Sequence, residues 1–374
     1  MAKPLCAACG STAVERWGKT GSGAQRWRCG ACGATFTQRT GNAAKRLLGF
    51  LGWLLSKARQ ADMPGGGRTF RGRTAELWRV WPPPPVAGEA CRVVFVDGIC
   101  LARNVVVLIA RSGGHVLGWY VARSENSRAY KALMARIAPP DVVVTDGGPG
   151  FQRARRELWP RTRVQRCAFH AFEQVKRYTT TRPRTQAGVD LYALARGLLS
   201  VATSEEAAAW VASCAGWCST YDEFLGEETT DDGGRTFLTH ERLVEARNSL
   251  TSLVRSGQLF TCVDPGLVSG LGPLPATNNA VESLSAQLRA MLREHGGLSL
   301  ERRIKAVCWW CRMHTECPLG AAGVLRVMPT DEDISKEMSL IGYEDRARIG
   351  PQRWGDGLVW EELHRSTPWR RDWD

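Results

Sequence analysis

The spacing of apolar residues divides the first part of the chain into two regions. Residues 1–40 are rich in Gly, Cys and Trp and show no helical period, whereas residues 43–60 place apolar side chains on one broad face and predict a helix. The segment Met63–Gly67 breaks this pattern, and a second helix is predicted from Arg71 to Val80. Two helices joined by a glycine-containing turn indicate a helix-turn-helix, with an ordinary helical hairpin as the alternative.

Four consecutive prolines, Pro82–Pro85, separate this region from a different pattern. Beyond them, short β-branched runs predict strands, and amphipathic runs between the later strands predict helices. The strands are at 92–96, 104–110, 115–121, 141–145 and 163–166, and the helices at 127–137 and 151–158. A three-strand meander followed by helical crossovers predicts an α/β fold with a mixed sheet and helices on both faces. Residues 168–255 are predicted to be helical throughout, and residues 278–293 form a further helix.

Composition excludes several classes of protein. Hydrophobic residues make up 44% of the 374 residues, which is too apolar for a disordered chain. The longest nearly apolar run, Leu47–Leu55, is far shorter than the roughly 20 residues that span a bilayer, so we expect no membrane protein. The first residues show no apolar signal segment, and we expect a cytoplasmic protein whose 13 cysteines are thiols or metal ligands.

The net charge of +13 is unevenly distributed along the chain. Residues 1–90 carry a net charge of +10, residues 91–177 one of +9, and the remainder one of −6. A basic half indicates a polyanionic partner, of which nucleic acid is the commonest, and the alternative is a charge that serves solubility alone.

Two Cys-x-x-Cys pairs lie close to the beginning of the chain. They consist of Cys6, Cys9, Cys29 and Cys32, and a structural Zn²⁺ is the expected ligand, with four unrelated thiols as the alternative. Arg26 and Arg28 flank a tryptophan on the strand that leads into the second pair.

Two aspartates stand at the ends of predicted strands. Asp97 follows residues 93–96 and precedes a glycine, and Asp146 follows residues 142–145 and precedes two glycines. If the strands are neighbours, the two carboxylates meet, and with a third carboxylate they would suit Mg²⁺ or Mn²⁺. The alternative is that each Asp-Gly is a routine turn. The helix pattern does not decide whether the third ligand is Glu282, Glu294 or Glu301.

Several segments match one protein family in the same order. They are Val-Phe-Val-Asp97-Gly, Val-Val-Thr-Asp146-Gly-Gly, Gln165-Arg166-Cys167-Ala-Phe-His170, Thr277-Asn278-Asn279-Ala-Val-Glu282 and two segments at 288–295 and 302–311. With these segments the chain resembles bacterial insertion-sequence transposases of the mutator-like DDE group, in the subgroup with an N-terminal zinc ribbon. The resemblance covers about residues 5–317.

The resemblance implies a ribonuclease H-like core with an all-α insertion, in which Asp97, Asp146 and Glu282 hold two Mg²⁺ or Mn²⁺ ions. Cys167 and His170 match a Cys-x-x-His motif beside the active site, and Asn278 and Asn279 belong to the same neighbourhood. Ser285 departs from the pattern, which has Asn there. The implied activity is metal-dependent cleavage of DNA at transposon ends, followed by attack of the freed 3′-hydroxyl on target DNA.

Double-stranded DNA, both transposon ends and target, is the expected partner, and a homodimer is expected because two ends are handled together. In the cell the protein is then cytoplasmic, and nucleoid-associated when bound to DNA. The residues expected to contact DNA are Arg26, Arg28, Arg68, Arg71, Arg73, Arg153, Arg155 and Arg156. The alternatives are a non-catalytic zinc-ribbon and helix-turn-helix regulator with a decayed core, and a ribonuclease H-type nuclease.

This interpretation divides the chain into seven segments. They are a zinc ribbon (1–40), a helix-turn-helix (41–81), a Pro-rich linker (82–90), the first part of the core (91–167), a helical insertion (168–270), the last core helices with the catalytic Glu (271–317) and a tail without a predicted role (318–374). The remaining cysteines, including Cys308 and Cys311 on one predicted helix, are expected to pack in the interior.

Overall fold

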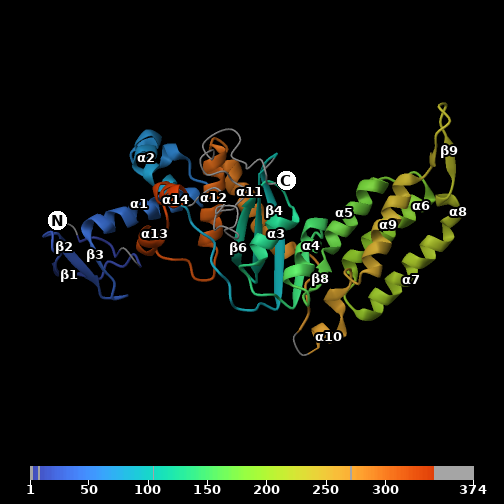
Figure 1. Cartoon of the computed structure of the whole chain (residues 1–374), viewed down its shortest axis with the longest axis horizontal. Coiled ribbons are helices and arrows are strands. Elements are labelled where there is room, and N and C mark those ends of the chain that lie inside the picture. Colours follow the sequence, from blue (N-terminus) through green and yellow to red (C-terminus); the bar gives the residue numbers. More distant parts are fainter. Residues whose placement is uncertain (1–2, 7–8, 104, 270–271, 341–374) are drawn as a thin grey trace. The chain divides into compact units, whose positions relative to one another are not determined.

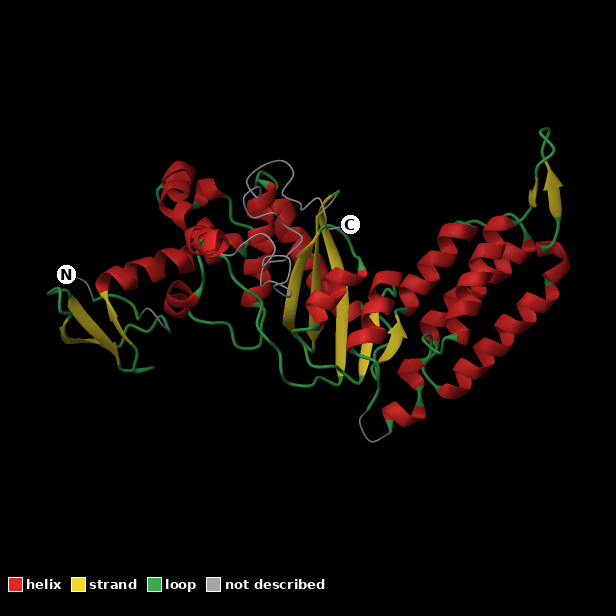
Figure 2. Ribbon diagram, viewed as in Figure 1, coloured by secondary structure: helices red, strands yellow, loops and turns green. Residues whose placement is uncertain are grey.

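The computed structural model describes residues 3–6, 9–103, 105–269 and 272–340. The chain forms two compact units, whose elements are drawn in Figure 1 and Figure 2. Unit 1 contains the described residues of Met1–Glu89, Gly98–Ile137 and Ser283–Asp374, and unit 2 contains those of Ala90–Asp97 and Ala138–Glu282. In the described ranges, no helix combines the length and the apolar character needed to cross a membrane.

A small antiparallel sheet begins unit 1. Its strands are β1 (Val14–Lys19), β2 (Gln25–Cys29) and β3 (Thr35–Thr37), in the order β1-β2-β3. Trp27 pairs with Phe36 across β2 and β3, and both side chains are buried on the inner face of the sheet. So few buried residues make a very small apolar core, and domains of this size usually need an additional cross-link.

Two helices follow the small sheet, and both begin earlier than predicted. α1 (Gln38–Leu54) starts inside the segment predicted to belong to the ribbon. The prediction that the second helix begins at Arg71 is wrong, because Gly65 adopts a left-handed φ of 88° and acts as the N-cap of α2 (Gly66–Thr74). Two 3-10 helices, η1 (Gln60–Asp62) and η2 (Ala75–Arg79), precede and follow α2.

A five-stranded mixed sheet confirms the prediction of an α/β fold. Its strand order is β6-β5-β4-β7-β8, in which β5 and β6 are antiparallel and β7 is parallel to both β4 and β8. The strands are β4 (Val93–Ala102), β5 (Val105–Ser112), β6 (His115–Ala122), β7 (Val142–Thr145) and β8 (Arg163–Arg166). The prediction that the first of these ends at Val96 is wrong, since β4 continues to Ala102.

Helices cover both faces of the strands β5 and β6, as predicted. Gly118 of β6 faces α3 (Ser127–Met134), because a Cβ atom at this position would lie 3.7 Å from Leu133. The next residue, Trp119, points to the opposite face and lies beside Cys308 of α12 (Leu300–Met313). With helices on both sides, β5 and β6 are buried over almost their whole length.

Unit 2 contains α4 between β7 and β8, followed by a helical segment. The helices are α4 (Pro149–Leu158), α5 (Ala168–Thr179), α6 (Gln186–Gly197), η3 (Leu198–Ser200), α7 (Ser204–Thr220), α8 (Asp222–Leu225), α9 (Glu241–Arg255), η4 (Thr261–Val263) and α10 (Pro265–Val268). The prediction of helix throughout 168–255 is wrong, because β9 (Glu228–Thr230) and β10 (Thr236–Leu238) form a hairpin. Asp231 accepts the N–H groups of Gly233 and Arg235 in its turn, and such a turn favours a hairpin over a helix.

The last described helices are α11 (Asn279–Glu294), α12, α13 (Ala321–Val327) and α14 (Asp331–Leu340). Val324 and Ile334 are fully buried in the core of unit 1, so the described part of the tail belongs to this unit. Lys305 is also completely buried, and its Nζ lies 2.6 Å from Glu301 Oε1 and 2.8 Å from Asp331 Oδ1.

Most of the other cysteines behave as expected of packing residues. Cys214, Cys262, Cys308 and Cys311 are buried, and Cys91 and Cys218 are half-buried. The prediction is wrong for Cys100, which lies near the end of β4 and is exposed, and also for Cys317, which follows α12 and is exposed.

Candidate metal sites and nucleic-acid interface

Four sulfur atoms converge beside the small sheet. The Sγ atoms of Cys6 and Cys32 are 3.6 Å apart, as are those of Cys9 and Cys29, and all four lie within 4.8 Å of one another. A tetrahedral zinc ion with bonds of about 2.3 Å separates its sulfurs by about 3.8 Å. The cluster therefore fits a structural Zn²⁺, and it is the one compact group of three or more His, Cys, Asp or Glu ligands found in the part of the chain that the structure describes.

Tight turns aim these sulfurs at a common point. Gly10 and Gly33 adopt left-handed φ angles of 73° and 71°, and their N–H groups donate to the carbonyl oxygens of Cys6 and Cys29. Burial raises the pKa of Cys29, but hydrogen bonds from backbone N–H groups of its turn and from the neighbouring cysteines outweigh burial and lower the pKa to about 6. Backbone N–H groups also lower the pKa of Cys9 and Cys32, but hydrogen bonds with other cysteines, together with burial, raise it overall, so the four thiols act on one another. The ionised form of a cysteine is the one that binds a metal.

Asp97 and Asp146 occupy matched positions on neighbouring parallel strands. β4 pairs with β7 in a register that sets Val96 opposite Thr145, so the two aspartates come next on their strands and project to the same side of the sheet. Both residues are half-buried. Asp97 lies within β4 rather than after it, whereas Asp146 follows β7 directly as predicted. The sheet therefore brings to one place the two carboxylates that the sequence singled out.

A guanidinium group lies against the turn that follows Asp146. Gly147 has a left-handed φ of 81°, and a Cβ atom here would collide with Nη1 of Arg166, the last residue of β8. Burial lowers the pKa of Arg166, while the negative charge of Asp146 raises it. Glycine is thus required at position 147, and its absence of a side chain admits a positive charge beside the carboxylate.

Cys167 and His170 form an interacting pair at the start of α5. Hydrogen bonding to Cys167 raises the pKa of His170 above its ordinary value, burial opposes this, and the charges of Cys167, Asp146 and Asp97 add to the increase. Both aspartates are therefore within electrostatic reach of one imidazole ring. The structure brings the Cys-x-x-His motif and the two aspartates into one site of unit 2.

The third acid of the predicted triad lies at the limit of the described structure. Glu282 belongs to α11, but its side chain and that of Asn279 lie outside the described residues. Asn278 is buried, and its N–H donates to Sγ of Cys167 at a distance of 3.4 Å. Among the described side chains, no third His, Cys, Asp or Glu forms a compact ligand group with Asp97 and Asp146.

The small sheet presents a basic surface that includes an exposed aromatic ring. The guanidinium of Arg28 lies 4.4 Å from the ring centroid of Trp17, which is 45% exposed, and Arg26 is half-buried beside Thr35. Trp17 was not among the predicted contacts. The sequence does contain a signal for it, since a tryptophan in an otherwise polar strand, close to arginines, is typical of surfaces that stack on nucleic-acid bases.

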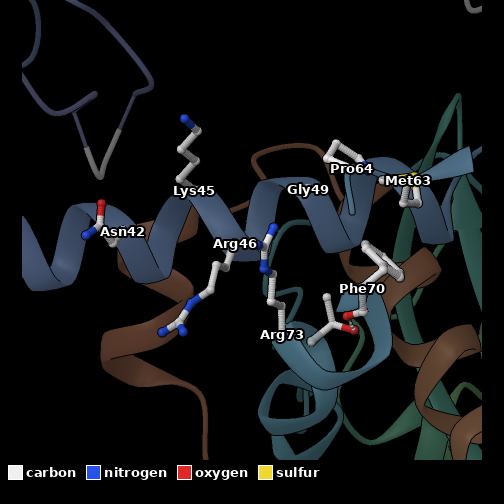
Figure 3. Close-up of a pocket in the computed structure, with 9 residues that line it drawn as sticks. Asn42, Lys45, Arg46, Gly49, Met63, Pro64, Phe70 and Arg73 are labelled. Carbon is white, nitrogen blue, oxygen red and sulfur yellow. Dashed lines mark hydrogen bonds between the residues drawn. The ribbon is translucent and has the colours of Figure 1, made fainter. Parts of the chain in front are cut away.

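A pocket of about 990 Å³ lies between α1 and α2 (Figure 3). Met63, Pro64 and Phe70 contribute apolar groups to its lining, and Figure 3 shows Lys45 and Arg46 projecting from α1 in different directions. Both are exposed, and Arg46 forms an ion pair with Glu76 at 2.9 Å. Arg73 lines the same pocket from α2, and the other predicted contacts of this helix, Arg68 and Arg71, are exposed. The exposed cations support an anionic partner on this part of unit 1. Lys45 and Arg46 were not predicted as contacts, although they occupy the polar side of α1 opposite its apolar face.

The three predicted arginines of α4 do not share one role. Arg153 and Arg156 are exposed, but Arg155 reaches the loop after α4, where its Nη1 donates to the carbonyl oxygens of Pro160 at 3.2 Å and Thr162 at 3.4 Å. A side chain bonded to its own backbone in this way has fewer donors left for a phosphate. Arg155 therefore supports the loop after α4 more than a DNA contact.

No family model matches the sequence of this chain. No curated protein is significantly similar to it.

Proposed function

We propose that the protein is a DDE transposase that binds the terminal inverted repeats of an insertion sequence, cuts the DNA at its ends and joins them to target DNA. The observation that carries this proposal is the matched position of Asp97 and Asp146 on neighbouring parallel strands, next to Cys167 and His170. One of these acids alone is typical of an ordinary turn, whereas two on the same face create a site for a divalent cation.

The architecture supports a ribonuclease H-like core. The sheet combines a strand meander with two parallel strands, and α4 connects β7 to β8. A mainly helical segment then follows β8 and precedes α11, so an insertion separates the second aspartate from Glu282. These features agree with the order of motifs in the family that the sequence resembles.

The donor set fits hard divalent cations. Asp97, Asp146 and Glu282 would hold two Mg²⁺ or Mn²⁺ ions through carboxylate oxygens, which are the ligands these ions prefer. When bound, the ions supply an activated water for cleavage and stabilise the attacking and leaving oxygens. Arg166 places a positive charge beside Asp146, where it orients the phosphate that is cut.

The DNA partner is proposed from the basic surfaces of unit 1. Arg28 with Trp17 on the small sheet, and Lys45 with Arg73 around the pocket between α1 and α2, combine positive charge with aromatic or apolar groups. Phosphates bind such cations without regard to sequence, and adjacent aromatic rings add stacking contacts. A homodimer follows from the need to hold both ends of the element together.

The test is end cleavage by Asp146→Asn. The substrate is a duplex that carries the inverted repeat of the element, and strand scission is measured with Mg²⁺ and with Mn²⁺. We expect a loss of about 1000-fold, because metal-assisted charge stabilisation contributes several kcal/mol to such reactions. Asp141→Asn, on an exposed aspartate that precedes β7, is the matched control and should cut at the wild-type rate. Wild-type cutting by Asp146→Asn would refute the proposed site.

The same assay separates the alternatives. A non-catalytic regulator binds the duplex but never cuts it, and a ribonuclease H-type nuclease cuts RNA–DNA hybrids in preference to transposon ends. Inverted repeats in the DNA on both sides of the gene would favour the transposase over either alternative.

A further inference from the structure

One residue connects the end of β7 with the start of α11. The N–H of Cys167 donates to the carbonyl oxygen of Thr145, the residue before Asp146, at 2.9 Å. The sulfur of the same residue accepts the N–H of Asn278, the residue before α11, at 3.4 Å. Cys167 thus bonds on one side to the strand that carries Asp146 and on the other to the helix that carries Glu282.

A second hydrogen bond holds the same approach to α11. The N–H of Ala168 donates to the carbonyl oxygen of Ala276 at 3.0 Å. The segment Ala276–Asn278 is therefore attached at two points to the first residues of α5. Of these two attachments, only the one through the Cys167 sulfur depends on a side chain, so it is the one that mutation can remove.

The sulfur of Cys167 lies at the N-terminal ends of two helices. Cys167 is the N-cap residue of α5, and Asn278 immediately precedes α11. The N-terminus of a helix carries a partial positive charge and free N–H donors, both of which favour an anionic acceptor. Burial alone raises the pKa of Cys167, but hydrogen bonds from His170 and from Asn278 lower it overall. These surroundings favour the sulfur as a hydrogen-bond acceptor.

Cys167 has no access to a substrate. Its exposed fraction is 0%, and the described residues around it are the strand end, the start of α5 and the approach to α11. A nucleophile or a direct DNA contact needs an exposed atom, so a role through neighbouring residues is the one that its position permits.

We propose that Cys167 is a positioning residue whose sulfur holds the N-terminus of α11 against the end of β7, and thereby sets the place of Glu282 relative to Asp146. The part that concerns Glu282 as a metal ligand rests on the proposed function, whereas the attachment of α11 does not. Glu282 follows the bonded Asn278 by about one helical turn, so release of this point displaces the whole first turn of the helix.

Three variants test this role. Cys167→Ala removes the acceptor, and Cys167→Ser retains one that lies farther from the Asn278 N–H, because the Cβ–O bond is shorter than the Cβ–S bond. Cys262→Ala is the matched control, because Cys262 is also buried in unit 2 but its sulfur is not the acceptor for Asn278. Circular dichroism establishes that each variant is folded before it is compared.

The first measurement is hydrogen exchange of the full-length protein, read on the peptide that contains the Asn278 amide. Loss of this hydrogen bond should accelerate exchange of that amide by about 10-fold in Cys167→Ala, with an intermediate rate in Cys167→Ser. Cys262→Ala should exchange like the wild type. An unchanged rate in Cys167→Ala overturns the proposal, and if this variant does not fold, an unchanged rate in Cys167→Ser overturns it.

The second measurement is Mn²⁺ binding, followed by titration calorimetry without DNA. We expect Cys167→Ala to bind Mn²⁺ about 10-fold more weakly and Cys167→Ser to recover part of the loss, as is usual for residues that orient metal ligands. Wild-type Mn²⁺ affinity in Cys167→Ala, together with faster exchange, would overturn the part that concerns Glu282. A wild-type protein that neither binds Mn²⁺ nor cuts DNA would contradict the proposed function, and hydrogen exchange would still decide whether Cys167 holds α11.

Discussion

Substitution Cys29→Ser should abolish zinc binding by the small sheet of unit 1. The observed Sγ–Sγ separation of 3.6 Å corresponds to a tetrahedral centre about 2.2 Å from each sulfur. This is within about 0.1 Å of the usual Zn–S bond length, so the ion is accommodated with almost no rearrangement. We expect one Zn²⁺ per chain in the wild type and four sulfur neighbours at about 2.3 Å in its X-ray absorption spectrum.

The size of the effect follows from the number of ligands. Replacing residues that merely orient a metal ligand weakens metal affinity about 10- to 100-fold, so loss of a direct ligand should exceed this range. Zinc content after dialysis, measured by plasma mass spectrometry, should fall from about one to nearly zero equivalents. Cys100→Ser is the control, because Cys100 is exposed and lies on β4, outside the cluster.

Loss of zinc should also unfold the small sheet. The sheet contributes few buried apolar residues of its own, chiefly Val14, Trp27 and Phe36, to the core of unit 1, so its folding should depend on the zinc cross-link. Limited proteolysis should therefore cut within residues 1–40 of Cys29→Ser and leave them intact in Cys100→Ser. The reasoning is refuted if the wild type takes up no zinc, or if Cys29→Ser retains a full equivalent.

Three other predictions address stability, thiol reactivity and DNA binding. Lys305→Met should reduce the free energy of unfolding in urea by about 3–5 kcal/mol, because it removes the buried cation that pairs with the carboxylates of Glu301 and Asp331. Lys57→Met changes an exposed lysine and should have little effect. Burial raises the pKa of Cys214 to about 11 and that of Cys308 to about 12. At pH 8 iodoacetamide should therefore label the exposed Cys100 and Cys317 before these two thiols, as read by mass spectrometry, and equal labelling of Cys308 would contradict this. Arg73→Ala should make the logarithm of the DNA-binding constant fall less steeply with the logarithm of salt concentration, by about 0.9 in slope, because one phosphate is no longer neutralised. Fluorescence anisotropy measures this slope, which Arg196→Ala, at an exposed position on α6, should leave unchanged.

Local patterns in the sequence predicted the features that depend on few neighbours. Two Cys-x-x-Cys pairs predict a metal cluster because each turn needs only its own residues, and the four sulfurs do converge. The β-branched run before Asp146 likewise predicts β7, which begins one residue later than expected and ends at Thr145 as expected. The two aspartates were expected to meet only if their strands are neighbours, and the sheet order shows that they are.

Features that depend on backbone conformation or tertiary packing were not predictable in this way. The start of α2 depends on the left-handed conformation of Gly65. In a run of three glycines the sequence does not decide which residue adopts it. The hairpin β9–β10 lies between long helices, and its short polar strands lack the apolar alternation that identifies a strand. The contact of the Cys167 sulfur with Asn278 joins residues 111 positions apart, and no local pattern indicates it.

The positions of the two aspartates depend on how their strands pair. β4 and β7 are buried on both faces near the site, since Val94, Val96 and Val143 on one face are 0–1% exposed and Phe95 and Val144 on the other are 6% and 0% exposed. Continuous apolar strands of this kind carry no alternation that would specify a register. A slip of β7 by one residue would set Asp146 beside Val96 or Gly98, and the two carboxylates would then project to opposite faces of the sheet. The observed register, with Val96 opposite Thr145, is therefore what places both carboxylates on the same face.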